Sequence, residues 1–298
     1  MSPRRPRAPA LCRSWLFVPG ADEAAHRAAA RSGADVVILE LEDFTPPRLR
    51  ARARTLAAAA FARWRDAGAL AAVRVNPLAG DGRDDLAAVI PASPDIVLLP
   101  KVAEPAQIAE LERAVVALEQ RHRLKRDAIA LAPNIESARG IMQCYAIARA
   151  SARNVAIVGS TEDLAADLGA ERAPDGVELA YARARLHLEA RAAGVASIDC
   201  PFTFAGGAAL VREARNARRL GYAGKTAVRP EHVAVINRIF TPSADELRRA
   251  RATVAAFEAA RAAGRAGARL GNRLVEMPVY LNAQRLLERG RALGVRGA

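Results

Sequence analysis

The stretches A-I-A-L-A-P-N-I-E-S at 128–137 and V-A-I-V-G-S-T-E-D at 155–163 decide the fold of this 298-residue chain. Each is a short apolar run, typical of a buried β-strand, followed by a carboxylate: Glu136 in the first and Asp163 in the second. One helix-length segment separates the two runs, which indicates a parallel βαβ unit. Because the carboxyl ends of such strands meet at one edge, we expect the two acids to be neighbours. Two adjacent carboxylates suit a hard divalent cation such as Mg²⁺.

The same alternation of strand and helix runs through most of the chain. Short apolar runs recur, separated by Ala/Arg/Leu-rich segments with helical periodicity such as 104–121 and 177–193. Eight such units in about 240 residues favour an α/β fold of the (β/α)₈ or TIM-barrel type over an open sheet. We place the barrel at 11–240, with strands at 15–18, 36–41, 72–75, 96–99, 128–131, 155–158, 196–198 and 226–228.

The last part of the sequence, 241–298, follows a different pattern. The run T-P-S at 241–243 opens a long helix to about Ala263, with Thr241 or Ser243 as its N-cap. A Gly-rich stretch at 264–271 follows, and a final helix begins near Pro278, a residue favoured in the first turn. This part is too long for a ninth barrel unit, so we interpret it as a helical arm or lid.

Composition restricts the class of protein. With 51% hydrophobic and 26% charged residues the chain is globular. No apolar run approaches the ~20 residues needed to span a bilayer, so we expect no membrane partner. The start, residues 1–10, is basic and Pro-rich without an apolar stretch behind it, and predicts no signal peptide. Cys12, Cys144 and Cys200 lack metal-ligand spacing and fit a reducing cytoplasm.

The formal net charge of +13 invites the interpretation that the chain binds nucleic acid. All but three of the 45 cationic residues are arginines, scattered through Ala-rich helices rather than gathered with aromatic residues. Because nucleic-acid binders concentrate their charge on one face, we expect no nucleic-acid partner. A net positive field would still attract an anionic substrate.

Charged residues follow nearly every predicted strand. Taken singly, each is more simply a loop residue, a helix cap or a rim ion pair, for example Asp163 in the first turn of a helix or Arg74 beside Glu42. Barrel enzymes, however, carry their chemistry at the carboxyl ends of their strands. Together at one mouth, Glu136, Asp163 and Arg74 would hold a metal ion and a carboxylate.

Eight motifs in a fixed order resemble one known family. They are R-S-W-L-F-V-P-G (13–20), L-E-L-E-D (39–43), V-R-V-N (73–76), L-L-P-K (98–101), N-I-E-S-A-R-G (134–140), S-T-E-D-L-A-A-D-L-G (160–169), G-K-T-A-V-R-P (224–230) and F-T-P-S (240–243). Over about residues 11–290 the chain resembles the citrate lyase β-subunit-like and malyl-CoA lyase family of the HpcH/HpaI superfamily. The resemblance implies a (β/α)₈ barrel, a trimer or hexamer, and dependence on Mg²⁺, with Mn²⁺ as a substitute.

The resemblance also implies roles for individual residues. Glu136 and Asp163 match the metal ligands of the family, and Glu136 also borders the substrate. Arg74 matches the arginine that grips the keto-acid carboxylate. Glu42 and Asp43 match an acidic pair beneath the metal that holds its waters.

Two further parts of the family pattern concern the arm and coenzyme A. The arm in this family commonly covers a neighbouring subunit's site and delivers an acid there; Glu276 aligns with that acid, where Asp is usual, and is our candidate general acid. Ala24 and Ala28 stand where members commonly have basic residues that bind CoA phosphates. Arg229 replaces a usual His and could meet a phosphate instead. Arg13 and Arg229 are our candidate CoA-binding residues.

The implied activity is a reversible, Mg²⁺-dependent carbon–carbon cleavage. A 3-hydroxyacyl-CoA of the malyl, citramalyl or citryl class would give an acyl-CoA and a 2-keto acid. Three alternatives stay open: an aldolase that splits a free 4-hydroxy-2-keto acid without CoA, a thioesterase at the same site, and a diverged barrel without catalysis.

Overall fold

The structure, a computed structural model, describes residues 7–295. Residues 1–6 of the predicted start and 296–298 of the predicted arm lie outside the described residues. The chain divides into two compact units, one ending at Arg238 and one beginning at Ile239. Among the described residues, no helix is long and apolar enough to cross a membrane.

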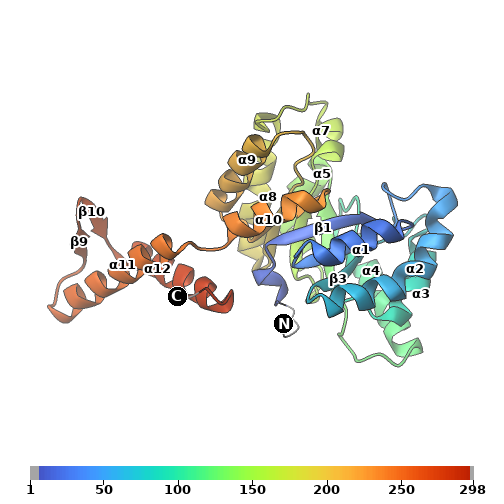
Figure 1. Cartoon of the computed structure of the whole chain (residues 1–298), viewed down its shortest axis with the longest axis horizontal. Helices are drawn as coiled ribbons and strands as arrows, with labels where there is room; N and C mark the ends of the chain where they lie inside the picture. Colours follow the sequence, from blue (N-terminus) through green and yellow to red (C-terminus); the bar gives the residue numbers. More distant parts are fainter. Residues whose placement is uncertain (1–6, 296–298) are drawn as a thin grey trace. The chain divides into compact units, whose positions relative to one another are not determined.

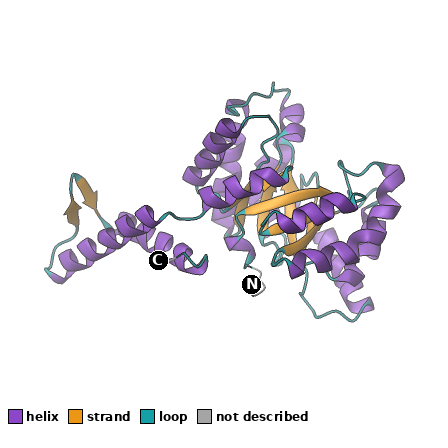
Figure 2. Ribbon diagram, viewed as in Figure 1, coloured by secondary structure: helices purple, strands orange, loops and turns teal. Residues whose placement is uncertain are grey.

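The first unit is a closed barrel of eight parallel strands, which confirms the predicted (β/α)₈ fold (Figure 2). Each strand pairs with the next one along the chain, and β1 pairs with β8 to close the ring. The strands are β1 Ser14–Pro19, β2 Val36–Glu40, β3 Leu70–Arg74, β4 Ile96–Leu99, β5 Ala130–Ile135, β6 Ala156–Gly159, β7 Ala196–Asp199 and β8 Gly224–Ala227.

Alternate strand residues fill the barrel. Val36 and Ile38 of β2, like Ile96 and Leu98 of β4, belong to one buried apolar cluster. The intervening residues are also buried, because helices cover the outer face, and this explains why the strands are almost continuously apolar. The period of two then directs Glu40, which follows Ile38, toward the barrel axis at the carboxyl end.

Helices surround the barrel between the strands (Figure 1). They are α1 Glu23–Arg31, α2 Pro47–Asp66, α3 Gly82–Val89, α4 Pro105–Arg121, α5 Ala138–Met142, α6 Cys144–Arg149, α7 Glu162–Leu168, α8 Ala180–Ala193, α9 Gly207–Leu220 and α10 Pro230–Phe240. Three short 3₁₀ turns accompany them: η1 Pro9–Leu11, η2 Ile90–Ala92 and η3 Val177–Leu179.

The largest strand correction concerns β5. The sequence predicted a strand at 128–131, whereas β5 extends to Ile135 and passes through Pro133, which pairs with Leu99 of β4. Proline lacks a backbone donor, but its fixed φ is compatible with extended backbone, so the strand continues. As a result Asn134 lies within β5, and Glu136 follows its last residue directly.

The second unit contains α11 Ala244–Ala262, the hairpin of β9 Ala268–Leu270 and β10 Arg273–Val275, and α12 Met277–Ala292. Ser243 is the N-cap of α11. A small apolar cluster, centred on Leu247, Ala250, Ala283 and Leu287, joins the two helices. The sequence indicated only a Gly-rich stretch there and predicted no strands, so the hairpin is a difference from that prediction. Gly271 at its turn adopts φ +61°, a left-handed conformation that glycine reaches without a Cβ clash.

Candidate active site at the carboxyl-terminal mouth of the barrel

A cavity of about 260 Å³ opens at the carboxyl ends of the strands. Its walls come from the ends of seven strands or the segments that follow them: β1, β2, β3, β5, β6, β7 and β8. The residues that line it include Asp43, Phe44, Arg74, Ser160 and Asp163. The cavity therefore lies at the end of the barrel that carries the catalytic residues in enzymes of this fold.

The structure brings Glu136 and Asp163 to neighbouring strand ends, as the sequence predicted. Strands β5 and β6 are paired, with Ile135 opposite Gly159. Glu136 follows β5 directly, and Asp163 lies in the first turn of α7, just after β6. The hydroxyl of Ser160 donates a hydrogen bond of 3.1 Å to Oδ2 of Asp163 and orients that carboxylate.

Glu136 lies in surroundings that disfavour its negative charge. Its side chain is only 1% exposed, and within residues 7–295 neither carboxylate oxygen accepts a hydrogen bond. Burial raises the pKa of Glu136 to about 8; Arg74 Nη1, 3.6 Å from Oε1, opposes this rise, and the charges of Asp163 and Glu42 add to it.

A divalent cation fits this site because it would supply the missing partner of Glu136. It would also lower the repulsion between Glu136 and Asp163. Within the described part of the chain no group of three or more His, Cys, Asp or Glu side chains is arranged to hold a metal. A hard cation here would therefore combine two carboxylates with water and substrate oxygens, an arrangement typical of Mg²⁺.

Arg74 lies among acids on the inner wall of the mouth. Its Nε donates a hydrogen bond of 2.8 Å to Oε1 of Glu40, and its Nη2 lies 3.4 Å from Glu42 and 3.7 Å from Asp43. Burial acts to lower the pKa of Arg74, but the carboxylates around it, Glu40 and Glu42 above all, raise the pKa beyond its usual value. The guanidinium also lies over the ring of Phe17, with 4.8 Å to the ring centroid.

Glu40 is a site residue to which the sequence analysis gave no role. It is fully buried, and its Oε1 accepts both Arg74 Nε and the backbone N–H of Glu42, each at 2.8 Å. Its Oε2 accepts the backbone N–H of Phe44 at 2.5 Å. One carboxylate thus fixes Arg74 and the loop that carries Glu42 and Asp43. The period of two from Val36 through Ile38 was the signal that could have identified it.

Lys101 is a second residue whose contacts the sequence did not predict. It follows β4 with φ +53°, a left-handed conformation that is unusual for a residue with a Cβ. Its Nζ donates a short hydrogen bond to Oε1 of Glu42 and lies 3.6 Å from Asp43. Burial raises the pKa of Glu42, and the neighbouring Arg74 and Lys101 partly offset this rise.

The assignment of Arg13 to coenzyme A is wrong. Arg13 precedes β1, at the amino-terminal end of the strands, which is the end opposite the cavity. It is buried there and donates to both oxygens of Asp35, at 2.7 and 2.9 Å. Its guanidinium therefore ties the start of β1 to the segment before β2. Arg229 is exposed and follows β8 at the carboxyl end, so its role in CoA binding stays a prediction.

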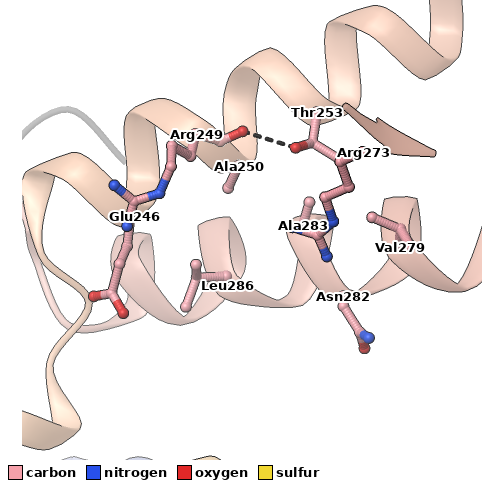
Figure 3. Close-up of a pocket in the computed structure, with 9 residues that line it drawn as sticks. All are labelled: Glu246, Arg249, Ala250, Thr253, Arg273, Val279, Asn282, Ala283 and Leu286. Carbon is pink, nitrogen blue, oxygen red and sulfur yellow. Dashed lines mark hydrogen bonds between the residues drawn. The ribbon is translucent and has the colours of Figure 1, made fainter. Parts of the chain in front are cut away.

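Glu276 belongs to the second unit, where it is exposed and is the N-cap residue of α12. That unit has its own cavity of about 210 Å³, lined by α11, β10 and α12 (Figure 3). The one acid in this cavity, Glu246, accepts a hydrogen bond from the backbone of Ser243 and so caps α11. Because paired carboxylates are missing from its lining, we place the candidate active site in the barrel and not here.

Comparisons with known proteins agree with this geometry. The family HpcH/HpaI aldolase/citrate lyase matches residues 13–230. The citrate lyase subunit beta of Leuconostoc mesenteroides subsp. cremoris is 32% identical over 280 residues, which are 93% of this chain and 93% of that protein. A (3S)-malyl-CoA thioesterase of Cereibacter sphaeroides (strain ATCC 17029 / ATH 2.4.9) is 31% identical, covering 94% of this chain and 95% of that protein.

A solved structure gives the same result. The protein CitE from Mycobacterium tuberculosis, in complex with magnesium, acetoacetate and coenzyme A, superposes with a TM-score of 0.77. The two chains are 28% identical, and the match covers 95% of this chain and 99% of the other. With the barrel, the paired acids and these relatives in agreement, the chain belongs to the HpcH/HpaI aldolase/citrate lyase family, which includes carbon–carbon lyases.

Proposed function

We propose that this chain is a divalent-metal-dependent lyase that reversibly cleaves a 3-hydroxyacyl-CoA of the malyl, citramalyl or citryl class into an acyl-CoA and a 2-keto acid. The observation that carries the proposal is the buried carboxylate of Glu136, which accepts no hydrogen bond in residues 7–295 and lies beside Arg74 and Asp163. The magnesium and coenzyme A named in the related CitE structure, and the citrate lyase name of the relatives, support it.

Glu136 and Asp163 would hold Mg²⁺, or Mn²⁺ in its place. When bound, the ion supplies Lewis-acid stabilisation of negative charge on substrate oxygens, typically several kcal/mol. Glu42 and Asp43 lie on the same rim and would accept hydrogen bonds from water at the site. Their own positions are fixed by Glu40 and Lys101, so these acceptors are already oriented before substrate binds.

Arg74 would hold the carboxylate that ends up on the 2-keto acid. Its Nε is occupied by Glu40, whereas Nη1 and Nη2 approach acids at 3.4 to 3.7 Å and can present two parallel donors. The rings of Phe17 and Phe44 lie against the guanidinium, at 4.8 and 5.9 Å from their centroids. Fixing this carboxylate orients the bond to be broken.

Cleavage requires two proton movements. The substrate hydroxyl loses its proton to water at the site as the carbon–carbon bond breaks and a carbonyl forms. The electron pair of the broken bond passes to the carbon next to the thioester, which must then accept a proton. Glu276 is our candidate for that general acid, and in the reverse direction it would remove a proton from the acyl-CoA.

Hydrolysis of the thioester is the second candidate function. The observation that favours it is the name of the relatives from Cereibacter sphaeroides, (3S)-malyl-CoA thioesterase, at 31% identity over nearly the whole chain. Hydrolysis would need only a water placed at the thioester carbonyl in the same cavity. A CoA-independent aldolase is a third outcome. Ala24 and Ala28 carry no charge and Arg13 lies at the opposite end of the barrel, so few candidates are left to bind the CoA phosphates.

The test is a substrate panel read by mass spectrometry. Purified protein is incubated with malyl-, citramalyl- and citryl-CoA and with a free 4-hydroxy-2-keto acid, in Mg²⁺ or EDTA. We expect metal-dependent release of a shorter acyl-CoA with glyoxylate, pyruvate or oxaloacetate. Release of free CoA would assign the thioesterase, and turnover of the free acid alone would assign the aldolase.

Variants connect that activity to the site. We expect Glu136→Gln and Asp163→Asn to abolish turnover in Mg²⁺. The matched control is Asp66→Asn, which removes an exposed acid at the last residue of α2, toward the opposite end of the barrel. Wild-type activity in Glu136→Gln would remove the metal site from the proposal.

A further inference from the structure

The side chains around the barrel cavity carry more negative than positive charge. Arg74 is the one cation among the described residues that line it. Asp43, Glu162 and Asp163 are acids in the same walls, and Oε1 of Glu136 lies 3.6 Å from Nη1 of Arg74. Arg74 and a divalent cation together would supply three positive charges, one fewer than these four acids require. The cavity is therefore unfavourable for anionic groups other than those that Arg74 and the metal hold directly.

The wall across the cavity from Arg74 is neutral. In the closed ring of eight strands β7 lies opposite β3, which ends in Arg74, and β8 is next to β7. The segment after β7 contributes Pro201 and Thr203 to the lining, and the end of β8 contributes Val228, which packs on the apolar cluster inside the barrel. Arg229, the next residue, is exposed and lies outside the lining. A charged group against this wall would lose water without gaining a partner.

The hydroxyl groups of the lining do not make this wall more favourable for an anion. Thr203 Oγ1 donates to Oε1 of Glu162 at 2.6 Å, and Ser160 Oγ donates to Oδ2 of Asp163 at 3.1 Å. Thr161 Oγ1 has no hydrogen-bond partner in residues 7–295, but protein atoms enclose it. Two of the three donors are thus already used by acids, and the third is neutral and covered.

Two cations close to the cavity are held by acids of their own. Arg172 Nε lies 3.3 Å from Oε1 of Glu162, and its Nη1 donates to Glu178. Lys101 Nζ donates to Glu42. Neither Arg172 nor Lys101 belongs to the lining. Within the described walls, a second carboxylate on the substrate would meet acids and apolar groups but no unpaired cation.

We propose that the 2-keto acid bound at this site carries a single carboxylate, which selects the malyl and citramalyl classes of substrate and excludes the citryl class. The inference rests on the function proposed above and narrows it. Glyoxylate, pyruvate and oxaloacetate differ only in the group on the keto carbon: a hydrogen atom, a methyl group or a CH₂–carboxylate group. With the shared carboxylate at Arg74, the rest of the keto acid extends toward the neutral wall. A methyl group finds apolar neighbours there, whereas a second carboxylate stays unpaired.

The first experiment measures keto-acid binding to the Mg²⁺-loaded protein by isothermal titration calorimetry. We expect glyoxylate and pyruvate to bind about tenfold more tightly than freshly dissolved oxaloacetate. The matched ligand is 4-methyl-2-oxopentanoate, which has a neutral branched group of similar size where oxaloacetate has its second carboxylate, and it should also bind more tightly than oxaloacetate. Oxaloacetate binding as tight as that of pyruvate would overturn the proposal. Equally weak binding of the two larger acids would also overturn it, because size and not charge would then select the ligand.

Because binding needs no turnover, this measurement is separate from the lyase assay. Preference for a single carboxylate without any carbon–carbon cleavage would refute the lyase and keep the ligand class. Efficient cleavage of citryl-CoA would keep the lyase and refute the ligand class.

The second experiment adds a cation to the neutral wall. Thr203→Lys introduces an ammonium group there, and Thr203→Met is the matched control, because its side chain is also long and unbranched and it loses the same hydrogen bond to Glu162 without adding charge. We expect Thr203→Lys to raise the affinity for oxaloacetate relative to pyruvate by about tenfold, and Thr203→Met to keep the wild-type preference. Thermal melts verify that both variants fold. The same preference in the two variants would show that charge at this wall does not select the keto acid.

Discussion

The buried carboxylate of Glu136 suits a metal site but lowers the stability of the metal-free protein. Its carboxylate is buried without a hydrogen bond from residues 7–295, and burial raises its pKa from 4.5 to about 8. A group whose folded pKa is raised contributes its full stability below its unfolded pKa, and this contribution is lost as pH rises through the folded pKa. The metal-free protein should therefore lose stability between about pH 4.5 and pH 8 on account of this residue.

Glu136→Gln should remove that loss, because the amide is neutral at every pH in the range. In EDTA we expect the variant and the wild type to melt alike near pH 5, and the variant to be more stable by a few kcal/mol at pH 9. Mg²⁺ should raise the melting temperature of the wild type and leave that of Glu136→Gln unchanged. Thermal melts across this pH range, with Asp66→Asn as control, provide the measurement; parallel pH profiles would contradict the assigned burial.

Glu40 acts through Arg74 and the 42–44 loop rather than on the substrate. In Glu40→Gln the hydrogen bond from Arg74 Nε loses the negative charge of its acceptor, and hydrogen bonds to charged groups contribute about 1.5–3 kcal/mol. We expect KM for the 2-keto acid in the condensing direction to rise about tenfold, with a smaller change in kcat.

Arg74→Lys should likewise raise KM more than it changes kcat, because lysine keeps the charge but lacks the planar fork of the guanidinium. Steady-state kinetics with varied keto acid separate the two constants. A fall in kcat alone in Glu40→Gln would mean that Glu40 serves the chemical step and not the position of Arg74.

At the scale of elements, the strands and helices follow local chemistry closely. The capping box of α11 is an example: Ser243 Oγ accepts the N–H of Glu246 at 3.2 Å, and the Glu246 carboxylate accepts the N–H of Ser243 at 2.7 Å. Sequence alone identified Ser243 as a candidate cap. The unit it supports has a small apolar cluster, so we expect loss of the cap to be measurable there.

Ser243→Ala should cost about 1 kcal/mol in the second unit, because α11 loses one partner of its first-turn donors. Hydrogen exchange at the first turn of α11 should accelerate about fivefold, while the barrel amides stay protected. Asp22→Ala, which removes the N-cap of α1 in the barrel, is the matched control and should leave α11 unchanged. Uniform acceleration in both units would show that they unfold together.

At the scale of the whole molecule, the proposed chemistry requires an acid from the arm and a metal site from the barrel. In the function we propose, the arm of one chain serves the site of another. Glu136→Gln and Glu276→Gln should each be inactive, Glu276→Gln through kcat more than through keto-acid affinity. Chains of the two variants, unfolded and refolded together, should regain part of the activity, because some sites then combine an intact barrel with an intact arm.

Refolding each variant alone is the control for that experiment and should give no activity. Complete absence of complementation, with both variants folded, would place Glu276 in the site of its own chain or outside the chemistry. Wild-type kcat in Glu276→Gln would leave the arm as a cover only.

The sequence by itself determined the barrel and the main acids of its mouth. Strand and helix periods are local properties, so eight apolar runs with helical segments between them were enough to predict the fold. Strand direction then placed Glu136 and Asp163 at one edge. Local pattern missed the continuation of β5 through Pro133 and the hairpin beside Gly271, where tertiary pairing overrides intrinsic preference.

Only the tertiary structure decided which distant residues meet. Closing the ring placed Arg13 at the amino-terminal end with Asp35, and directed Glu40 inward to Arg74. It also gave α8 two apolar faces, one of which is left exposed at Tyr181 and Leu188. The physical reason is that the periodicity of a sequence shows which positions are apolar and how regularly they recur along a strand or helix. The partner it reaches depends on the strand order and register of the closed barrel, which no short stretch of sequence contains.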